Sequence, residues 1–180
     1  MKNTSDIFTE WLVLGCQQGD KKAFNLLVKQ WHPKILSQAF GYSKSRLAAK
    51  DIAQETWSSV VKGMNSIKDP ARFSVWINQI VYHKSVDWIR RVQKNRSLAP
   101  FDIKESLYHQ SESNSDEVAN MMIHLNQLPA DQKMVLTLFY LQQHSVVEIA
   151  EILNIPNGTV KSRLFNARET LKKKLKEILQ

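Results

Sequence analysis

Apolar residues recur along this chain at intervals of three and four positions, and no segment shows sustained alternation of apolar and polar residues. The three-to-four spacing is typical of amphipathic α-helices, whereas half-buried strands require alternation. Glycine is also scarce, with five in 180 residues. The pattern therefore predicts an all-α fold.

The N-terminal half divides into helices expected at residues 7–18, 20–41, 45–65 and 70–96. Asp20 can cap the second helix, and Asp69 before Pro70 is typical of a helix start. Pro33 should kink or interrupt the second helix because it lacks the amide hydrogen. Candidate core residues of the last two helices are Ile52, Trp57, Val60, Val61, Met64, Phe73, Trp76, Ile77, Ile80, Val81 and Trp88.

The C-terminal part predicts helices at 116–128, 130–142 and 146–153, followed by a long helix from residue 159. Ser145 and Glu148 fit a capping box, in which each side chain hydrogen-bonds the other's amide. The last helix places an apolar stripe on one side, made of Val160, Leu164, Ala167, Leu171, Leu175 and Ile178.

The net charge of +8 is distributed unevenly along the chain. Basic residues dominate 84–96 and 156–180, whereas residues 97–117 hold five acidic side chains and one basic one. This acidic segment is rich in serine and longer than loops usually run within one domain. We therefore expect two small helical domains, residues 6–96 and 118–180, joined by a flexible acidic linker at 97–117.

Several classes of site have no counterpart in the sequence. The single cysteine, Cys16, excludes a disulfide framework and a multi-cysteine zinc site. The histidines show no metal-ligand or triad spacing, and there is no glycine-rich phosphate loop. We expect no catalytic residue, metal, cofactor or small-molecule substrate. No apolar run approaches the roughly 20 residues that cross a bilayer, so a cytoplasmic protein is expected.

The region from 145 onward has the pattern of a helix-turn-helix: a short capped helix, a turn containing Gly158, and a helix with small and basic residues. A DNA major groove admits one helix, whose N-terminal turns then face the bases and phosphates. An ordinary helical hairpin with a solvated basic face has the same spacing and remains open. The candidates for DNA contact are Thr159, Lys161, Ser162, Arg163, Phe165, Asn166 and Arg168.

Four segments, in chain order, resemble the extracytoplasmic-function sigma factors of the sigma-70 family. Gly19-Asp-Lys-Lys-Ala-Phe-Asn-Leu-Leu27 is similar to the opening of their first domain, and Asp51-Ile-Ala-Gln-Glu-Thr56 to its polymerase-binding segment. Phe73-x-x-Trp76-x-x-x-Ile80 with Asp87-x-x-Arg90-Arg91 resembles the promoter-melting helix. Gly158-Thr-Val-Lys-Ser-Arg-Leu-Phe-Asn-Ala-Arg168 resembles the promoter-recognition helix.

This resemblance implies an initiation factor rather than an enzyme. Such a factor binds bacterial core RNA polymerase and directs it to promoter DNA, while the polymerase performs the catalysis. The second domain would read the minus-thirty-five element as duplex, and the first would contact the minus-ten element and capture the non-template strand. Many relatives are held inactive by an anti-sigma factor, which is a further expected partner.

The resemblance also assigns the polymerase contact to three residues of the third helix. Asp51, Gln54 and Glu55 are three and four positions apart, so they share one helix face. In relatives this face docks onto the coiled-coil clamp of the largest polymerase subunit. Without the resemblance, a solvated polar face would be the simpler interpretation.

On the promoter-melting helix, Asp87, Arg90 and Arg91 match positions where relatives contact the DNA backbone and the single strand. His83 stands where many relatives have an asparagine near the pocket for a flipped-out base, and a surface histidine without a role is an equal alternative. Asn166 stands where relatives often carry a basic residue. The two departures leave the preferred promoter sequence open.

Two other classes of protein remain as alternatives. A helix-turn-helix repressor or activator would use the N-terminal helices for dimerisation or ligand binding, and would bind DNA as a homodimer without polymerase. A DNA-cleaving or strand-transferring enzyme would need a nucleophile supported by cations within one domain.

Overall fold

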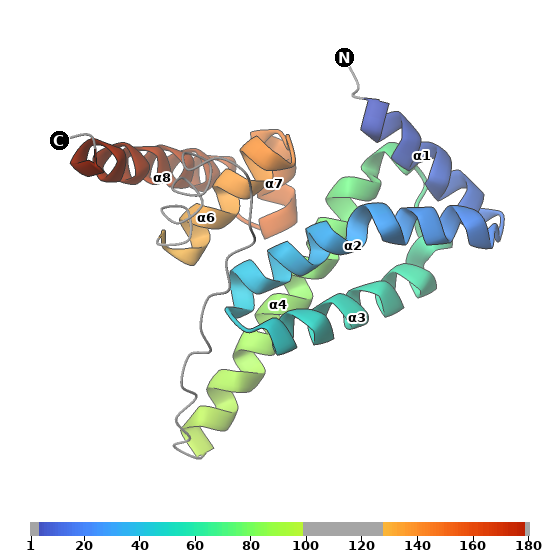
Figure 1. The fold of residues 1–180 in the computed structure, drawn as a ribbon, viewed down its shortest axis with the longest axis horizontal. Helices are drawn as coiled ribbons and strands as arrows, with labels where there is room; N and C mark the ends of the chain where they lie inside the picture. The colour runs from blue at the N-terminus through green and yellow to red at the C-terminus, as the bar shows by residue number, and fades with distance from the viewer. Residues whose placement is uncertain (1–3, 99–127, 179–180) are drawn as a thin grey trace. The chain divides into compact units, whose positions relative to one another are not determined.

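The computed structural model describes residues 4–98 and 128–178, which belong to two compact units, Met1–Pro100 and Phe101–Gln180 (Figure 1). Within the described residues of both units every regular element is helical and none is a strand. The predicted all-α fold is confirmed. The helix expected at 116–128 and the linker beyond residue 98 lie outside the described residues.

The first unit is built from the helices α1 (Thr4–Gln17), α2 (Lys21–Ser43), α3 (Arg46–Gly63) and α4 (Phe73–Leu98). Short 3₁₀ turns at Met64–Ser66 and Pro70–Arg72 connect α3 to α4. The expected caps are present: an Asp20 carboxylate oxygen accepts from the Lys22 amide at 2.7 Å, and Asp69 from the Ala71 amide at 3.0 Å. Local cap chemistry therefore determines where α2 and the 3₁₀ turn leading into α4 begin.

The expected interruption at Pro33 is absent, since α2 runs through it without a break. Pro33 is exposed, whereas Trp31 and Ile35 on either side are buried in the core. Burial of these two side chains offsets the loss of one backbone hydrogen bond at proline. Tertiary packing here overrides the local preference.

The core of the first unit joins residues from all four helices. The Trp31 and Phe73 rings meet edge to face, with centroids 5.4 Å apart. The helices α1 and α2 approach so closely that a Cβ on Gly15 would lie 2.8 Å from the Ala23 Cβ. The main buried cluster consists of Leu12, Val13, Ala23, Leu27, Trp31, Ile35, Ala53, Val60, Met64, Phe73, Ile77 and Val81.

One core prediction for α3 is wrong. Val61 is 61% exposed, although the neighbouring Val60 is fully buried. The two valines are adjacent, so they differ by about 100° around the helix axis and only one of them can face the core. Val61 therefore belongs to the outer face of α3.

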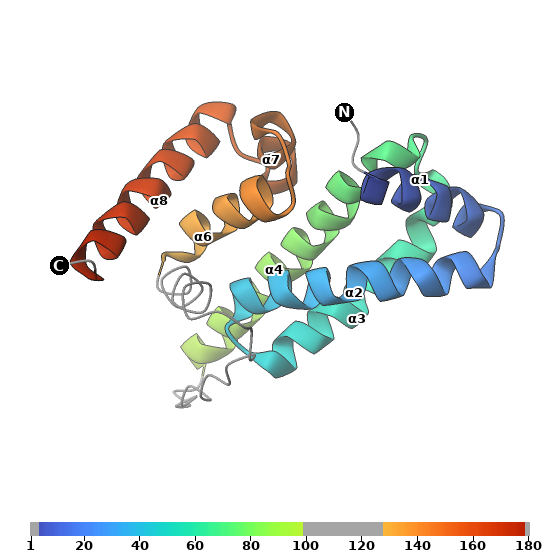
Figure 2. The same ribbon diagram turned by 45° about the horizontal axis from the view of Figure 1, so that its top comes forward.

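The second unit contains α6 (Ala130–Leu136), α7 (Val146–Leu153) and α8 (Asn157–Ile178), with α7 and α8 joined by a short turn (Figure 2). The helix expected at 130–142 is present as far as Leu141, but its last part, Thr137–Leu141, widens into a π-helical turn. The Gln142 amide accordingly donates to the Thr137 carbonyl, five residues back, at 3.0 Å. Leu138 on this turn is fully buried, so the widened turn contributes to the core.

The capping box at the start of α7 is present as predicted. The Glu148 amide donates to Ser145 Oγ at 3.2 Å, and the Ser145 amide donates to Glu148 Oε2 at 2.8 Å. At the other end of α7, Asn154 adopts a left-handed conformation with φ of 51°. The chain therefore reverses direction over a few residues and begins α8 at Asn157, two residues before the predicted start.

Candidate functional site

The helix α8 has one buried and one exposed face. Val160, Leu164 and Ala167 are buried against the rest of the unit. Of the seven residues of α8 that are predicted to contact DNA, Thr159 and Arg163 are half-buried. The other five are exposed, namely Lys161, Ser162, Phe165, Asn166 and Arg168. The short turn after α7 presents the N-terminal half of this face to solvent, as a helix that enters a groove requires.

The exposed face of α8 combines the donors and acceptors that read nucleic acid. Lys161 supplies an ammonium, and Asn166 supplies an amide that can both donate and accept. The Ser162 hydroxyl donates to the Thr159 carbonyl at 3.0 Å, which leaves its lone pairs able to accept. Phe165 is 63% exposed, and an exposed ring among polar side chains suits the methyl group of thymine.

Arg163 does not share this exposed face. Its Nε lies 3.4 Å from Asp131 Oδ2 in the first turn of α6, and both side chains are partly exposed. The ion pair ties α8 to α6 and partly neutralises a cation that the sequence assigned to DNA. No local sequence pattern indicates the involvement of Asp131, which lies 32 positions before Arg163.

The exposed surface of α4 carries the second group of predicted DNA contacts. His83 is exposed, with its ring 5.7 Å from that of Tyr82. Arg90 and Asp87 are also exposed and lie one turn apart, with Nη1 and Oδ1 separated by 3.9 Å. Arg91 is turned toward α3.

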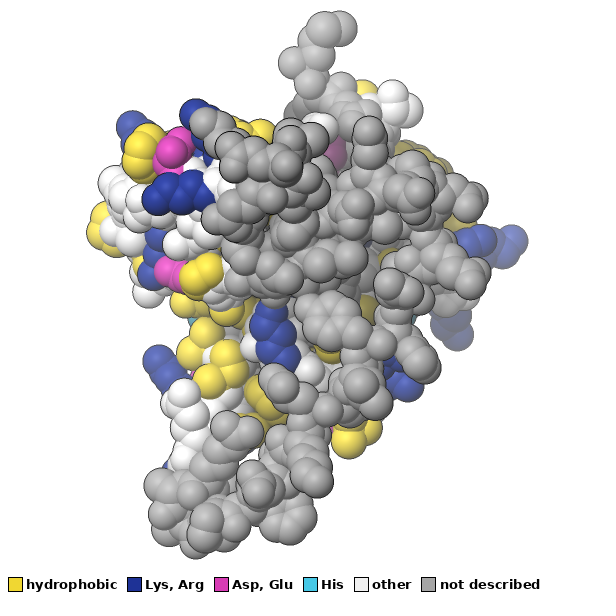
Figure 3. All heavy atoms as spheres, turned by 60° about the vertical axis from the view of Figure 1, so that its left-hand side comes forward, with side chains coloured by type: hydrophobic (Ala, Val, Ile, Leu, Met, Phe, Trp, Pro, Cys, Tyr) yellow, Lys and Arg dark blue, Asp and Glu magenta, His cyan; other side chains and the backbone are white. Residues whose placement is uncertain are grey.

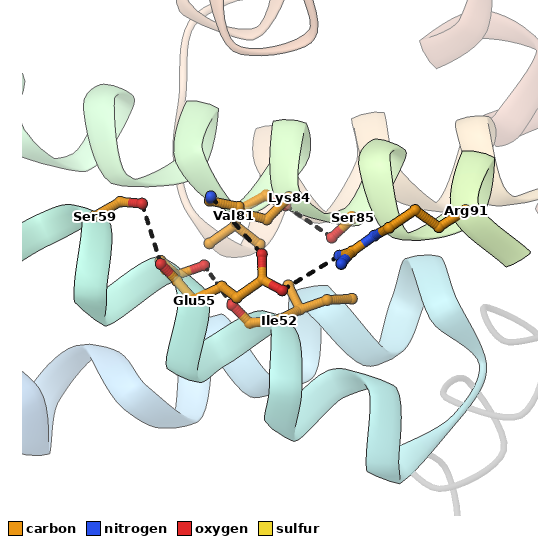
Figure 4. Close-up of polar contacts among 8 residues, drawn as sticks. Ile52, Glu55, Ser59, Val81, Lys84, Ser85 and Arg91 are labelled. Atoms are coloured by element: carbon orange, nitrogen blue, oxygen red, sulfur yellow. Dashed lines mark hydrogen bonds and ion pairs between the residues drawn. The ribbon is translucent and has the colours of Figure 1, made fainter.

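The carboxylate of Glu55 on α3 lies between two cations of α4 (Figure 4). Its Oε1 accepts from Arg91 Nη2 at 3.2 Å, and its Oε2 lies 3.7 Å from Lys84 Nζ. Glu55, predicted as a polymerase contact, and Arg91, predicted as a DNA contact, are therefore partners of each other in this structure.

Small buried hydroxyls accompany this contact on both helices. Thr56 Oγ1 donates to the Ile52 carbonyl at 2.8 Å. Ser85 Oγ donates to the Val81 carbonyl at 2.7 Å (Figure 4). Both residues are fully buried, and both hydroxyls are satisfied within their own helix. A small buried residue therefore follows Glu55 on α3 and Lys84 on α4.

The other two predicted polymerase contacts lie on the outer face of α3. Asp51 and Gln54 are exposed, and two large apolar side chains share their side of the helix: Leu47, 73% exposed, and Val61, 61% exposed. Leu47, Gln54 and Val61 are spaced by seven residues, which keeps them on one helical stripe. The sequence predicts no contact role for Leu47 and places Val61 in the core, although the spacing of both residues by seven from Gln54 is a usable signal.

Charged and apolar side chains are interspersed on the described part of one face of the molecule (Figure 3). On the face drawn in Figure 3, Lys and Arg side chains stand among hydrophobic and uncharged ones, with acidic side chains beside some of them. The part of the chain that the structure describes contains no group of three or more residues arranged to hold a metal ion. None of its helices is long and apolar enough to span a membrane. Cys16 is a half-buried free thiol whose pKa is raised by burial.

Comparisons with known proteins match both units. The family model described as sigma-70 region 2 matches residues 27–95, and the one described as sigma-70 region 4 matches residues 125–171. The chain is similar to the ECF RNA polymerase sigma-E factor of Haemophilus influenzae, with 32% identity over 93% of this chain and 95% of that protein. The protein of the same description from Escherichia coli K12 is 29% identical over 94% and 95% of the two chains.

Two solved structures share the fold. The sigma factor RpoE of Bartonella quintana, solved in complex with the anti-sigma factor NepR, has a TM-score of 0.74 and 24% identity, and the match covers 86% of this chain and 98% of that one. CnrH, solved in complex with the cytosolic domain of CnrY, has a TM-score of 0.63 and 22% identity, covering 94% and 98%.

Proposed function

The chain belongs to the extracytoplasmic-function (ECF) sigma factors of the sigma-70 family, and on this basis we propose that it binds bacterial core RNA polymerase, recognises promoter DNA and promotes transcription initiation. The observation that carries the proposal is the occurrence of both family segments in one chain, aligned over 93% of its length with a sigma-E factor. Matches in both units favour a sigma factor over the homodimeric repressor, which requires only the helix-turn-helix. Catalysis is assigned to the polymerase, and the proposed place of action is the cytoplasm.

We assign the minus-thirty-five element to the second domain, residues 118–180. Support comes from the exposed face of α8, where Lys161, Ser162, Phe165 and Asn166 are available to a major groove. Because base contacts give specificity and phosphate contacts give affinity, these side chains would set which sequence is read.

The first domain, residues 6–96, is assigned to core polymerase and the minus-ten element. The outer face of α3 suits a helical partner, because apolar Leu47 and Val61 flank the polar Asp51 and Gln54 on one stripe. The exposed Arg90 of α4 suits the phosphates of the opened strand, which bind cations without sequence preference.

An anti-sigma factor is proposed as a further partner. Both structural relatives were solved in complexes, one of them with a protein named as an anti-sigma factor. In this chain, α1 exposes apolar side chains that a partner could cover: Ile7, Phe8, Trp11 and Leu14. A protein that competes with core polymerase for the chain would support this partner, and mass spectrometry of material co-purified from its own cells would identify it.

Multi-round transcription with purified core polymerase and a library of promoter fragments tests the proposed function. Adding the protein should produce transcripts with new start sites, whereas core polymerase alone provides the control. If no new start site appears, the proposed function is wrong. A footprint made by the isolated protein at nanomolar concentration would instead favour the repressor.

A further inference from the structure

We propose that Glu55 neutralises Lys84 and Arg91 in the free protein and exchanges them for a cation of the polymerase, so that docking releases both side chains to DNA. The inference rests on the proposed function, since it joins the polymerase-binding helix α3 to the DNA-binding helix α4. It assigns Glu55 a role distinct from that of Asp51 and Gln54, with which the sequence grouped it.

The geometry brings one carboxylate to two cations. Lys84 and Arg91 are seven residues apart on α4, so they project from the same side of the helix. Each contacts a different oxygen of Glu55, at 3.7 Å and 3.2 Å. A single negative charge thus offsets Arg91, which is assigned to the DNA strand, and Lys84 on the same side of α4.

The ion pairs are of a kind that exchanges readily. The side chains of Glu55, Lys84 and Arg91 are 42%, 33% and 59% exposed, so water screens both contacts and neither charge is trapped in the core. A DNA phosphate can therefore replace the carboxylate at either cation, and a Lys or Arg of a partner can replace either cation at the carboxylate.

Glu55 is also within reach of a protein docked on α3. It directly follows the exposed Gln54 and lies one turn after the exposed Asp51, at the border between the outer face and the α4 contact. The carboxylates of Asp51 and Glu55 favour a partner surface that carries Lys or Arg. A partner cation that pairs with Glu55 would leave Lys84 and Arg91 with uncompensated charge, directly next to Arg90.

The test measures binding of the isolated full-length chain to a fluorescent single-stranded DNA of mixed sequence over a range of salt concentrations. The variant is Glu55→Gln, which keeps the side-chain shape and removes the charge. We expect the variant to bind about three- to tenfold more tightly than the wild type. The slope of the logarithm of the binding constant against the logarithm of the salt concentration should be steeper by about 0.7 to 1.4, which corresponds to one or two additional phosphate contacts. Asp51→Asn, which makes the same charge change on the outer face, is the matched control and should shift both quantities much less.

The results distinguish neutralisation of Lys84 and Arg91 by Glu55 from other roles of Glu55. If Glu55→Gln binds no more tightly than Asp51→Asn, the effect is one of net charge alone and the inference is overturned. Weaker binding would also overturn it, because Glu55 would then position the cations for DNA. The triple variant Glu55→Gln, Lys84→Gln, Arg91→Gln should lose the gain, and a gain that persists would contradict the assignment to these two cations.

A second measurement tests the exchange with polymerase. The advantage of Glu55→Gln over the wild type should shrink toward onefold when both are bound to core polymerase, since docking would already have released the cations. An undiminished advantage would refute the exchange. Binding of the wild-type chain to core polymerase is measured in the same series, so that failure of the proposed function itself is recognised independently of the DNA result.

Discussion

In α8, Lys161 and Arg168 project from an exposed face, and the cation that is paired, Arg163, contacts an acidic residue of another helix, α6. In α4, by contrast, Lys84 and Arg91 converge on one carboxylate of α3, and Arg90 lies near Asp87 of its own helix. The paired arginine of α8 links two helices of its unit and lies outside the exposed face. The paired cations of α4 are themselves part of the proposed binding surface.

The difference shows that the availability of a positive charge depends on where the nearest carboxylate lies. Both helices are basic in the sequence, and net charge alone would treat them as equivalent. We infer that the exposed face of α8 needs no rearrangement of its ion pairs to be accessible, whereas α4 becomes fully basic only when Glu55 is engaged elsewhere.

The largest expected effect tests whether α8 has two distinct faces. Leu164→Ala removes a buried side chain and should destabilise the second unit by about 2–5 kcal/mol. Phe165→Ala, at the next position but exposed, should change stability by less than about 0.5 kcal/mol. Chemical denaturation followed by circular dichroism measures both, and equal losses would contradict the orientation of the helix.

The next effect concerns promoter binding by α8. Lys161→Ala should weaken recognition of duplex promoter DNA by about 1–3 kcal/mol, if the ammonium contacts a base or a phosphate. Lys173→Ala, which removes the same charge from an exposed position three turns further along α8, is the matched control. Competition binding by the holoenzyme measures the promoter affinity of each variant relative to the wild type. The amount of each variant recovered by pull-down on core polymerase should be unchanged. Similar losses would mean that only total charge matters.

A third prediction probes the surroundings of α4 without altering its ion pairs. Tyr42 packs on Tyr82 of α4, and burial raises the pKa of its phenol well above the usual value. No described residue hydrogen-bonds this hydroxyl, so Tyr42→Phe should stabilise the first unit by up to about 1 kcal/mol.

The same substitution has a defined dependence on pH. Above about pH 10 a tyrosine ionises in the unfolded chain, while the Tyr42 phenol stays neutral in the folded protein. The free energy of unfolding therefore falls as pH rises through this range, and the fall should be smaller in Tyr42→Phe. Melting curves between neutral and alkaline pH test this, with the exposed Tyr140→Phe as the control. A fall of the same size in Tyr42→Phe would show that this phenol is not responsible.

The smallest expected effect concerns the ion pair between Asp131 of α6 and Arg163 of α8. Asp131→Asn breaks a partly exposed ion pair, so stability should change by less than about 1 kcal/mol. Without the Asp131 carboxylate, Arg163 can reach a phosphate. The slope of the logarithm of the duplex-binding constant against the logarithm of the salt concentration should then steepen by up to about 0.9, which is one phosphate contact. Weaker duplex binding would instead mean that Asp131 holds Arg163 in its productive position.

Features encoded by neighbouring residues were predictable from the sequence. The caps at Asp20 and Asp69 and the box of Ser145 and Glu148 depend on residues within a few positions, and they are present. The inward stripe of α8 is confirmed at Val160, Leu164 and Ala167, whereas the side chains of Leu175 and Ile178 lie outside the described part of the structure. The family motifs likewise indicated the class of protein, because they occur as short segments in a fixed order.

Features that depend on packing between helices were not predictable. The pairing of Glu55 with Lys84 and Arg91 joins residues 29 and 36 positions apart, which no local pattern specifies. The π-helical turn at Thr137–Leu141 keeps an almost helical sequence pattern, so it was read as regular helix. Continuity of α2 through Pro33 depends on the core around Trp31 and Ile35, which the local rule for proline ignores.

The Gln17 side chain at the end of α1 has a kinetic consequence. Its Nε2 donates to the Met64 carbonyl at 3.1 Å and to the Ile67 carbonyl at 2.8 Å, across sequence separations of 47 and 50 residues. Because closing a long loop costs conformational entropy, we expect these contacts to form late in folding. Loss of the Gln17 amide should therefore accelerate unfolding of the first unit and leave its folding rate nearly unchanged.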